Sequence, residues 1–162
     1  MARPVYREGA QRLVRVPVDS TTVIAVGDLV WYDTDDAKPA SDFTWDTNLA
    51  TTQAAFAKKF LGVAVEAHTA AEGATKTHIS VDMSVDSIYS FACTSDTYML
   101  GVPLGPAEGS STLSNTVLED AVKASAIAFS AEHLATAGTL VKASVCSARL
   151  PQNLFGQVGA AS

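Results

Sequence analysis

The chain has 162 residues, of which 48% are hydrophobic and only 17% charged, and its formal net charge is −6 at pH 7. This length suits one compact domain that buries a core without disulfides or metals. The acidic balance argues against general nucleic-acid binding, which needs clustered lysines and arginines, and no stretch is apolar enough for a membrane span. A surface with few charges loses its water at low cost, so the composition favours extensive contacts with other proteins.

The first 15 residues are basic, unlike the rest of the chain. Only Glu8 opposes the four arginines of this stretch, which are Arg3, Arg7, Arg12 and Arg15. We interpret residues 1–18 as an extended arm whose arginines bind an acidic neighbour, with a second copy of this chain as one option. A solvated, disordered tail is the alternative, because chain termini are often disordered. The start has no apolar signal-peptide segment, so we expect synthesis in the cytoplasm.

Hydrophobic patterning predicts mostly short strands in the first half. The predicted strands cover residues 13–18, 22–26, 29–32, 37–40, 60–65 and 77–81. Pro17 cannot donate to a sheet, so the strand at 13–18 should lie at an edge. The acidic segment 33–48 reads as a loop around the short strand 37–40. The alanine-rich residues 49–60 form the best candidate for a helix.

The second half continues in the same way. It predicts strands at 87–92, 98–104, 122–129 and 140–146, a turn at Gly105-Pro106, a polar loop at 108–116 and a turn at 132–138. Residues 151–162 should form a loosely ordered tail, tethered by Leu154 and Phe155. The expected fold is therefore mainly β: a β-rich domain over 19–150, built as a small β-barrel, β-tulip-like or sandwich domain with one short helix.

The two halves resemble each other weakly. A strand led by glycine, a Lys-Xaa-Ala/Ser element, an apolar strand and an alternating strand occur in the same order in both. The first series lies at 27–30, 38–41, 61–65 and 79–81, and the second at 101–104, 123–126, 127–129 and 141–145. A duplicated barrel unit would explain this order, and so would any meander of short strands.

Motifs for catalysis or metal binding are missing from the sequence. There is no GxSxG, P-loop or GxGxxG motif. His68, His78 and His133 lack zinc-ligand spacing and read as surface or half-buried side chains. The Asp33-Thr34-Asp35-Asp36 run lacks the Gly and Glu of a calcium loop. Cys93 and Cys146 read as small buried hydrophobes, although one bridge between them stays open. We predict no catalytic residue, no metal site and no cofactor, and therefore a protein that is not an enzyme.

Four aromatic residues lie close together along the acidic stretch: Trp31, Tyr32, Phe43 and Trp45. They suit core packing at the end of a barrel. The alternative is an anchor patch for a partner, because Trp and Tyr are enriched at protein interfaces. On that alternative we place Trp31, Tyr32 and Trp45 with the arginines as candidate partner-binding residues.

Three segments carry a resemblance to a known family. Residues 24–32 (IAVGDLVWY), 37–40 (AKPA) and 60–66 (FLGVAVE) resemble small phage head proteins in which a Gly-Asp strand pair precedes a Lys-Ala element and a Phe-Leu-Gly-Val-Ala strand. The likeness covers residues 20–85. The family is that of the bacteriophage capsid decoration, or cement, proteins, which have β-barrel or β-tulip folds and no catalytic residues.

The resemblance implies a role in the virion. Such proteins commonly form homotrimers on the outer surface of the capsid, bind the major capsid protein between capsomers, and hold the head against the pressure of its DNA. Their arms often become ordered on binding by adding a strand or draping over the capsid protein. Nucleic acid and membrane are not expected partners. The alternatives are another virion component, such as a head-fibre base or tail protein, and a small ligand-binding β-barrel.

Overall fold

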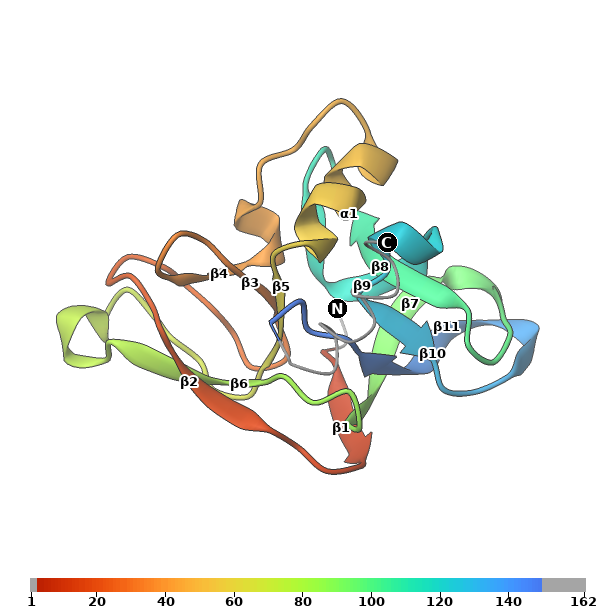
Figure 1. Cartoon of the computed structure of the whole chain (residues 1–162), viewed down its shortest axis with the longest axis horizontal. Coiled ribbons are helices and arrows are strands. Elements are labelled where there is room, and N and C mark those ends of the chain that lie inside the picture. The colour runs from red at the N-terminus through yellow and green to blue at the C-terminus, as the bar shows by residue number, and fades with distance from the viewer. Residues whose placement is uncertain (1–2, 150–162) are drawn as a thin grey trace, which may run out of the picture.

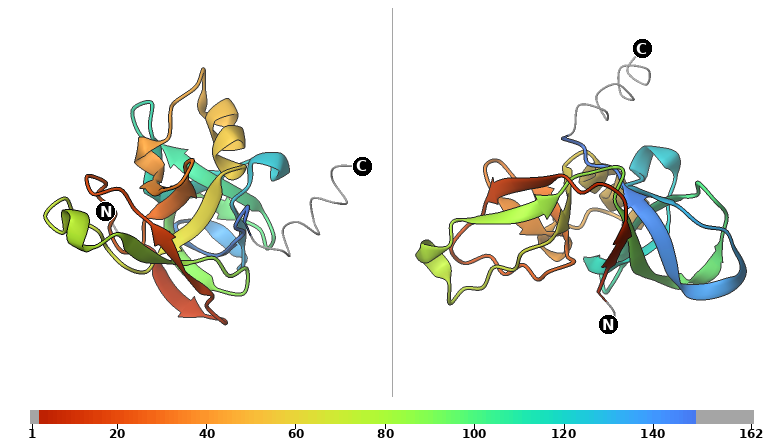
Figure 2. Two further views of the ribbon diagram at one scale, coloured as in Figure 1. Left: turned by 60° about the vertical axis from the view of Figure 1, so that its left-hand side comes forward. Right: turned by 90° about the horizontal axis from the view of Figure 1, so that it is seen from below.

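The structure is a computed structural model, and it describes residues 3–149. The fold is mainly β with one short helix: a closed five-stranded mixed β-barrel and a second antiparallel sheet. The two sheets form two lobes that lie side by side (Figures 1 and 2). The predicted tail, residues 151–162 with Leu154 and Phe155, lies outside the described residues.

The antiparallel sheet is formed by the first half of the chain. Its strand order is β2-β6-β5-β3-β4, and its strands are β2 (Leu13–Pro17), β3 (Leu29–Tyr32), β4 (Ala37–Pro39), β5 (Phe60–Ala64) and β6 (His78–Asp82). One face, which includes Leu29 and Val63, joins the barrel core. The other face, which includes Val30 and Leu61, packs in a smaller core of its own. Because both faces are covered, all five residues of β5 are buried.

The barrel is formed by the second half. Its strands are β7 (Ile88–Tyr98), β8 (Pro103–Glu108), β9 (Leu113–Asp120), β10 (Ala128–Ser130) and β11 (Leu134–Val145), in the order β7-β11-β10-β8-β9. A parallel pairing of β9 with β7 closes it, with Ala92 opposite Val117. Strand β1 (Val5–Glu8) pairs antiparallel with the start of β7, so the N-terminal segment crosses from one lobe to the other.

The two sheets repeat one strand order. We call strands β2–β6 the first unit and strands β7–β11 the second unit. In each unit the strands lie side by side in the order first, fifth, fourth, second and third. A 3₁₀ helix comes after the third strand in each unit: η1 (Ala40–Asp42) and η3 (Lys123–Ser125). The residues before these helices, Pro39 and Val122, have nearly the same backbone angles, φ −71° and ψ 157° against φ −73° and ψ 149°. The three strands matched in the sequence occupy equivalent positions, whereas Lys38 lies in β4 and Lys123 begins η3, so the matched lysines do not correspond. The common strand order favours a duplicated unit over an unrelated meander.

The helix α1 (Leu49–Ala57) is an insertion in the first unit, and it connects the two units. It begins after Asn48, whose side chain accepts the N–H of Thr51. The buried Gln53 donates from Nε2 to the carbonyl of Pro106 in β8, 3.0 Å away. A side chain at Gly105 would collide with this amide, because a Cβ there would lie 2.9 Å from Nε2. Glycine at position 105 therefore lets α1 approach the barrel.

Several predicted elements are wrong in the second half. Gly105 and Pro106 lie inside β8, not in a turn. The turn follows Tyr98 at residues 99–102, where Gly101 has φ +80°. A proline is tolerated in β8 because its backbone faces α1, where its carbonyl accepts from Gln53 and no sheet hydrogen bond is lost. The region 122–129 is η3 followed by β10, and 132–138 contains the start of β11.

Two differences concern the first half. Residues 22–26 form no strand, and Ile24 makes only an isolated bridge with His68. Short-range bonds replace strand pairing there, from Thr22 N–H to Asp19 and from Asp28 N–H to Ala25. His68 is fully buried, not half-exposed. Its ring nitrogens lie 2.6 and 2.8 Å from the carbonyls of Thr22 and Lys76, so it ties two loops together.

Candidate protein-binding surfaces

The corner between β1 and β2, residues 6–13, combines exposed apolar and basic side chains. Tyr6 and Leu13 are large hydrophobic residues with much of their surface exposed. Arg7 and Arg12 are exposed, and neither guanidinium has a hydrogen-bond or ion-pair partner within residues 3–149. Glu8 follows Arg7 in the chain, and the carboxylate of Asp82 accepts the backbone N–H of Arg12. The corner lies at the end of the molecule opposite α1 (Figure 1).

The backbone of this corner is held by a buried network around Asp82. Oδ1 of Asp82 accepts the N–H groups of Arg12 and Ser84, at 3.1 and 3.0 Å. Oδ2 accepts the hydroxyl of Tyr89 at 2.8 Å, and Gln11 donates to that hydroxyl. The ring of Tyr6 packs edge-on against Tyr89, with centroids 5.7 Å apart. The corner is therefore preorganised, although its long side chains point into solvent.

The other two predicted arginines bind carboxylates of their own chain. Arg3 donates to the carbonyl of Val26 and lies 4.0 Å from Asp28. Burial raises the pKa of Asp28, and the N–H of Ala25 and the charge of Arg3 act against that rise. Arg15 forms a 2.7 Å ion pair with Glu66. The structure thus separates the four arginines into two that face their own acidic lobe and two, Arg7 and Arg12, that are free.

The predicted aromatic residues lie around the main core. Trp31 is only 6% exposed, donates from Nε1 to the carbonyl of Pro39, and stacks edge-on with Phe43. Trp45 is half-buried against the same core. Tyr32 is half-buried on the other face of the sheet, with the guanidinium of Arg149 5.3 Å from its ring centroid. Trp31 therefore offers little surface to a partner, whereas Tyr32 and Trp45 each expose part of their side chain.

Three strands of the described chain have a free edge, and each free edge is poorly suited to strand addition. The β1 ladder is irregular between Tyr6 and Glu8. Strand β2 ends in Pro17, and β4 has three residues and ends in Pro39, whose carbonyl is occupied by Trp31. Bulges, prolines and short length are common protections of edge strands. Contacts with partners are therefore better supported through side chains than through added strands.

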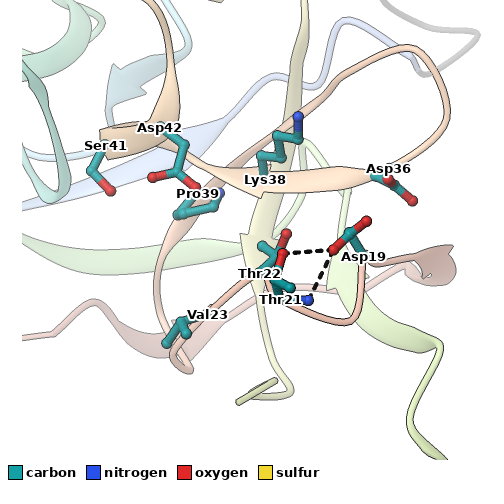
Figure 3. Close-up of a pocket in the computed structure, with 9 residues that line it drawn as sticks. All are labelled: Asp19, Thr21, Thr22, Val23, Asp36, Lys38, Pro39, Ser41 and Asp42. Carbon is teal, nitrogen blue, oxygen red and sulfur yellow. Dashed lines mark hydrogen bonds between the residues drawn. The ribbon is translucent and has the colours of Figure 1, made fainter. Parts of the chain in front are cut away.

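A polar groove of about 660 Å³ lies between the β2–β3 connection and β4 (Figure 3). One wall consists of residues 19–23, and the other comes from residues 36–42. Asp19 accepts the N–H and hydroxyl of Thr21 within the first wall. The groove occupies the seam between the first and third strands of the first unit, the place where β7 and β9 pair in the barrel. In this sheet β2 and β4 are the two edge strands, and no pairing joins them.

The remaining candidates for chemistry do not assemble into a site. Cys93 and Cys146 are free thiols, and burial raises the pKa of each. Asp33 of the acidic run pairs with Lys38 at 2.6 Å. Within the described part of the chain, no group of three or more His, Cys, Asp or Glu side chains is placed to hold a metal ion. None of the helices there is long and apolar enough to cross a bilayer.

Sequence reasoning did not identify the exposed apolar residues as a feature. Outside the corner, Val23, Val26, Met99, Leu100, Val122 and Leu140 are half or more exposed. Met99 and Leu100 lie in a tight turn, where polar residues are usual. The sequence does show two large apolar residues, Met99 and Leu100, before the turn glycine Gly101. The same pattern is also typical of the end of a buried strand, so it does not by itself indicate exposure.

Comparison with known proteins identifies no relative. No family model, curated protein or solved structure matches this chain.

Proposed function

We propose that this chain is a capsid decoration (cement) protein, which binds the outer surface of a phage head between capsomers and stabilises it against internal DNA pressure. The observation that carries the proposal is the corner at residues 6–13. There, two unpaired arginines stand beside exposed Tyr6 and Leu13 on a backbone fixed by Asp82. Arg and Tyr are the residue types that most often dominate binding energy at protein interfaces.

The architecture is suited to a protein that must resist mechanical deformation. The central sheet is buried on both faces, and α1 and the Asp82 network couple it to the barrel. Such a body resists deformation because close-packed cores tolerate little displacement. The segments that resemble decoration proteins form β3, β4 and β5 of this sheet, so the resemblance concerns the body of the molecule, and the corner supplies the contact.

Co-sedimentation with mature heads of the phage that encodes this chain tests the proposal. Deleting residues 1–15 is a poor test, because β2 would be lost and Val16 is buried in the core. The double variant Arg7→Glu/Arg12→Glu leaves the backbone intact. The control Lys58→Glu/Lys123→Glu makes the same change of charge at two exposed lysines outside the corner, one at the C-terminal end of α1 and one in η3.

We expect saturable binding of the parent chain and of the control, and at least about tenfold weaker binding of the corner variant. No binding of the parent chain to the heads would overturn the cement role. Equal binding of all three chains would leave a head-binding protein but remove the corner as its contact.

A further inference from the structure

The outer face of the barrel, where β1, β7, β11 and β10 lie side by side, carries several apolar side chains. Tyr89, Phe91 and Cys93 of β7 point into the core, so the alternate residues of that strand face outward. The strand registers place the outward residues of the four strands together. We call this set the barrel face, and it consists of Val5, Glu8, Ile88, Ser90, Ala92, Phe129, Leu140, Lys142 and Ser144.

One cation lies within the barrel face. Lys142 is opposite Ser90, which is opposite Val5, so the lysine has apolar or small neighbours across the strands. Glu132 accepts the backbone N–H of Lys142, but within the described chain no carboxylate lies within 4 Å of its ammonium group. Val5 and Leu140 beside it are 49% and 50% exposed. Lys142 thus lies in a patch of apolar and small side chains, and Glu8, opposite Ile88, is a carboxylate at the β1 side of the same face.

A second apolar surface lies at the end of the seam between β7 and β9. The parallel register that pairs Cys93 with Leu118 brings Asp96 next to the end of β9 at Asp120. Val122 follows two residues later, and the turn after Tyr98 presents Met99 and Leu100. We call this set the barrel end, and it consists of Asp96, Met99, Leu100, Asp120 and Val122.

The barrel end carries unsatisfied negative charge. Neither Asp96 nor Asp120 forms an ion pair in the part of the chain that the structure describes, and neighbouring Lys123 pairs with neither. Burial and the charge of Asp96 raise the pKa of Asp120. Leu100 is 70% exposed and Val122 67%. The two surfaces therefore complement each other around Lys142: this cation lies beside the exposed Val5 and Leu140, and Asp96 and Asp120 lie beside the exposed Leu100 and Val122.

We infer that the barrel end of one copy of this chain docks on the barrel face of another copy, with Asp120 and Asp96 opposite Lys142. The two surfaces differ, so the contact is heterologous, and it generates a closed ring or an open chain of copies. Desolvation by Leu100, Val122 and Leu140 would strengthen the charge pair relative to one in water. This inference does not depend on the proposed capsid role, because it concerns the isolated chain.

Sedimentation velocity of the full chain over a range of concentrations tests the contact. We expect reversible species larger than one copy. Lys142→Asp and Asp120→Lys should each weaken association about tenfold or more, because each places like charges in contact. In an Asp96→Asn background the double variant Lys142→Asp/Asp120→Lys should restore association, because the reversed pair is again complementary and no second carboxylate opposes it. Lys58→Asp on α1 is the control and should have no effect.

Leu100→Ser removes apolar surface without changing charge. It should weaken association while the unfolding temperature of dilute protein stays unchanged, because Leu100 is exposed in the monomer. A parent chain that stays a single copy at all concentrations would overturn the inference. So would association that is indifferent to both single charge reversals, or a charge-swapped double variant that fails to recover while it remains folded.

Discussion

The hydroxyl of Tyr89 donates a 2.8 Å hydrogen bond to Oδ2 of Asp82, across the junction between the two units. Asp82 ends β6 and is fully buried, while Tyr89 lies near the start of β7. Burial and the bond to Asp82 raise the pKa of Tyr89, so the phenol remains a donor at any pH near neutrality. The same carboxylate holds the backbone of Arg12. One buried pair therefore fixes the junction and the corner.

Tyr89→Phe should destabilise the protein by about 1–3 kcal/mol, because Oδ2 of Asp82 loses its only protein donor in the described structure and stays buried. Urea unfolding followed by Trp fluorescence measures the change. Tyr32→Phe is the matched control, since the Tyr32 hydroxyl has no hydrogen bond within residues 3–149, and it should shift stability by less than about 0.5 kcal/mol. Equal effects of the two changes would mean that the Asp82 bond contributes little.

Gly62→Ala should cost about 3 kcal/mol or prevent folding. A Cβ at position 62 would lie 2.2 Å from the carbonyl oxygen of Asp82, and a backbone atom of a neighbouring strand cannot move aside cheaply. Gly109→Ala is the control, because a Cβ there would meet nothing within 4 Å. Thermal unfolding by circular dichroism compares the two variants. Parent-like stability of Gly62→Ala would contradict this packing of β5 against β6.

Glu119→Gln should raise the unfolding temperature at pH 7. Burial and the charges of Glu108 and Asp120 raise the pKa of Glu119 in the folded protein. Its ionised carboxylate therefore destabilises the folded state at any pH above the ordinary pKa of a glutamate. The gain should fade below about pH 4, where the glutamate is protonated in both states. Glu66→Gln should behave oppositely, because the hydrogen bond from Lys76 lowers the pKa of Glu66, and that stabilisation is lost as pH falls. Melting curves of dilute protein at several pH values measure the change in unfolding temperature for each variant. Changes in the same direction for Glu119→Gln and Glu66→Gln at pH 7 would contradict the environments described for these two side chains.

The two thiols should react slowly with a disulfide reagent such as DTNB in the folded chain. Burial raises both pKa values and limits access. Cys93, which is buried, should react more slowly than half-buried Cys146, by roughly tenfold or more. Denatured, unreduced protein should release two equivalents at once. A count near zero would show a bridge where the structure has free thiols.

Prediction from sequence worked best for segments with one strong local pattern. The strands at β2, β3, β5 and β6 and the helix at α1 were located within a few residues, because their apolar runs and turn signals agree with their packing. It failed where packing opposes a local rule. Gly105-Pro106 reads as a turn, yet both residues lie in β8, where Gln53 of α1 donates a hydrogen bond to the carbonyl of Pro106.

The candidate surfaces depended on long-range contacts and were only partly predictable. The four arginines are visible in the sequence, but only the fold shows that Arg3 and Arg15 face their own carboxylates. Arg7 and Arg12 differ from Arg3 and Arg15 in that no carboxylate within residues 3–149 pairs with their guanidinium groups. In the same way, Lys142 and Asp120 are ordinary charges in the sequence, and strand register alone places each among apolar side chains.

Local properties of the sequence, namely alternation, turn residues and composition, were enough to predict a β-rich chain that is low in charge and has a similar order of elements in its two halves. They did not predict that the second unit closes into a barrel while the first stays open. In the second unit β9 pairs with β7 as well as with β8, whereas no pairing joins β4 to β2 in the first, and the groove lies there. Closure depends on the tilt and stagger of all the strands together, which are set by long-range packing and are not encoded in any one segment.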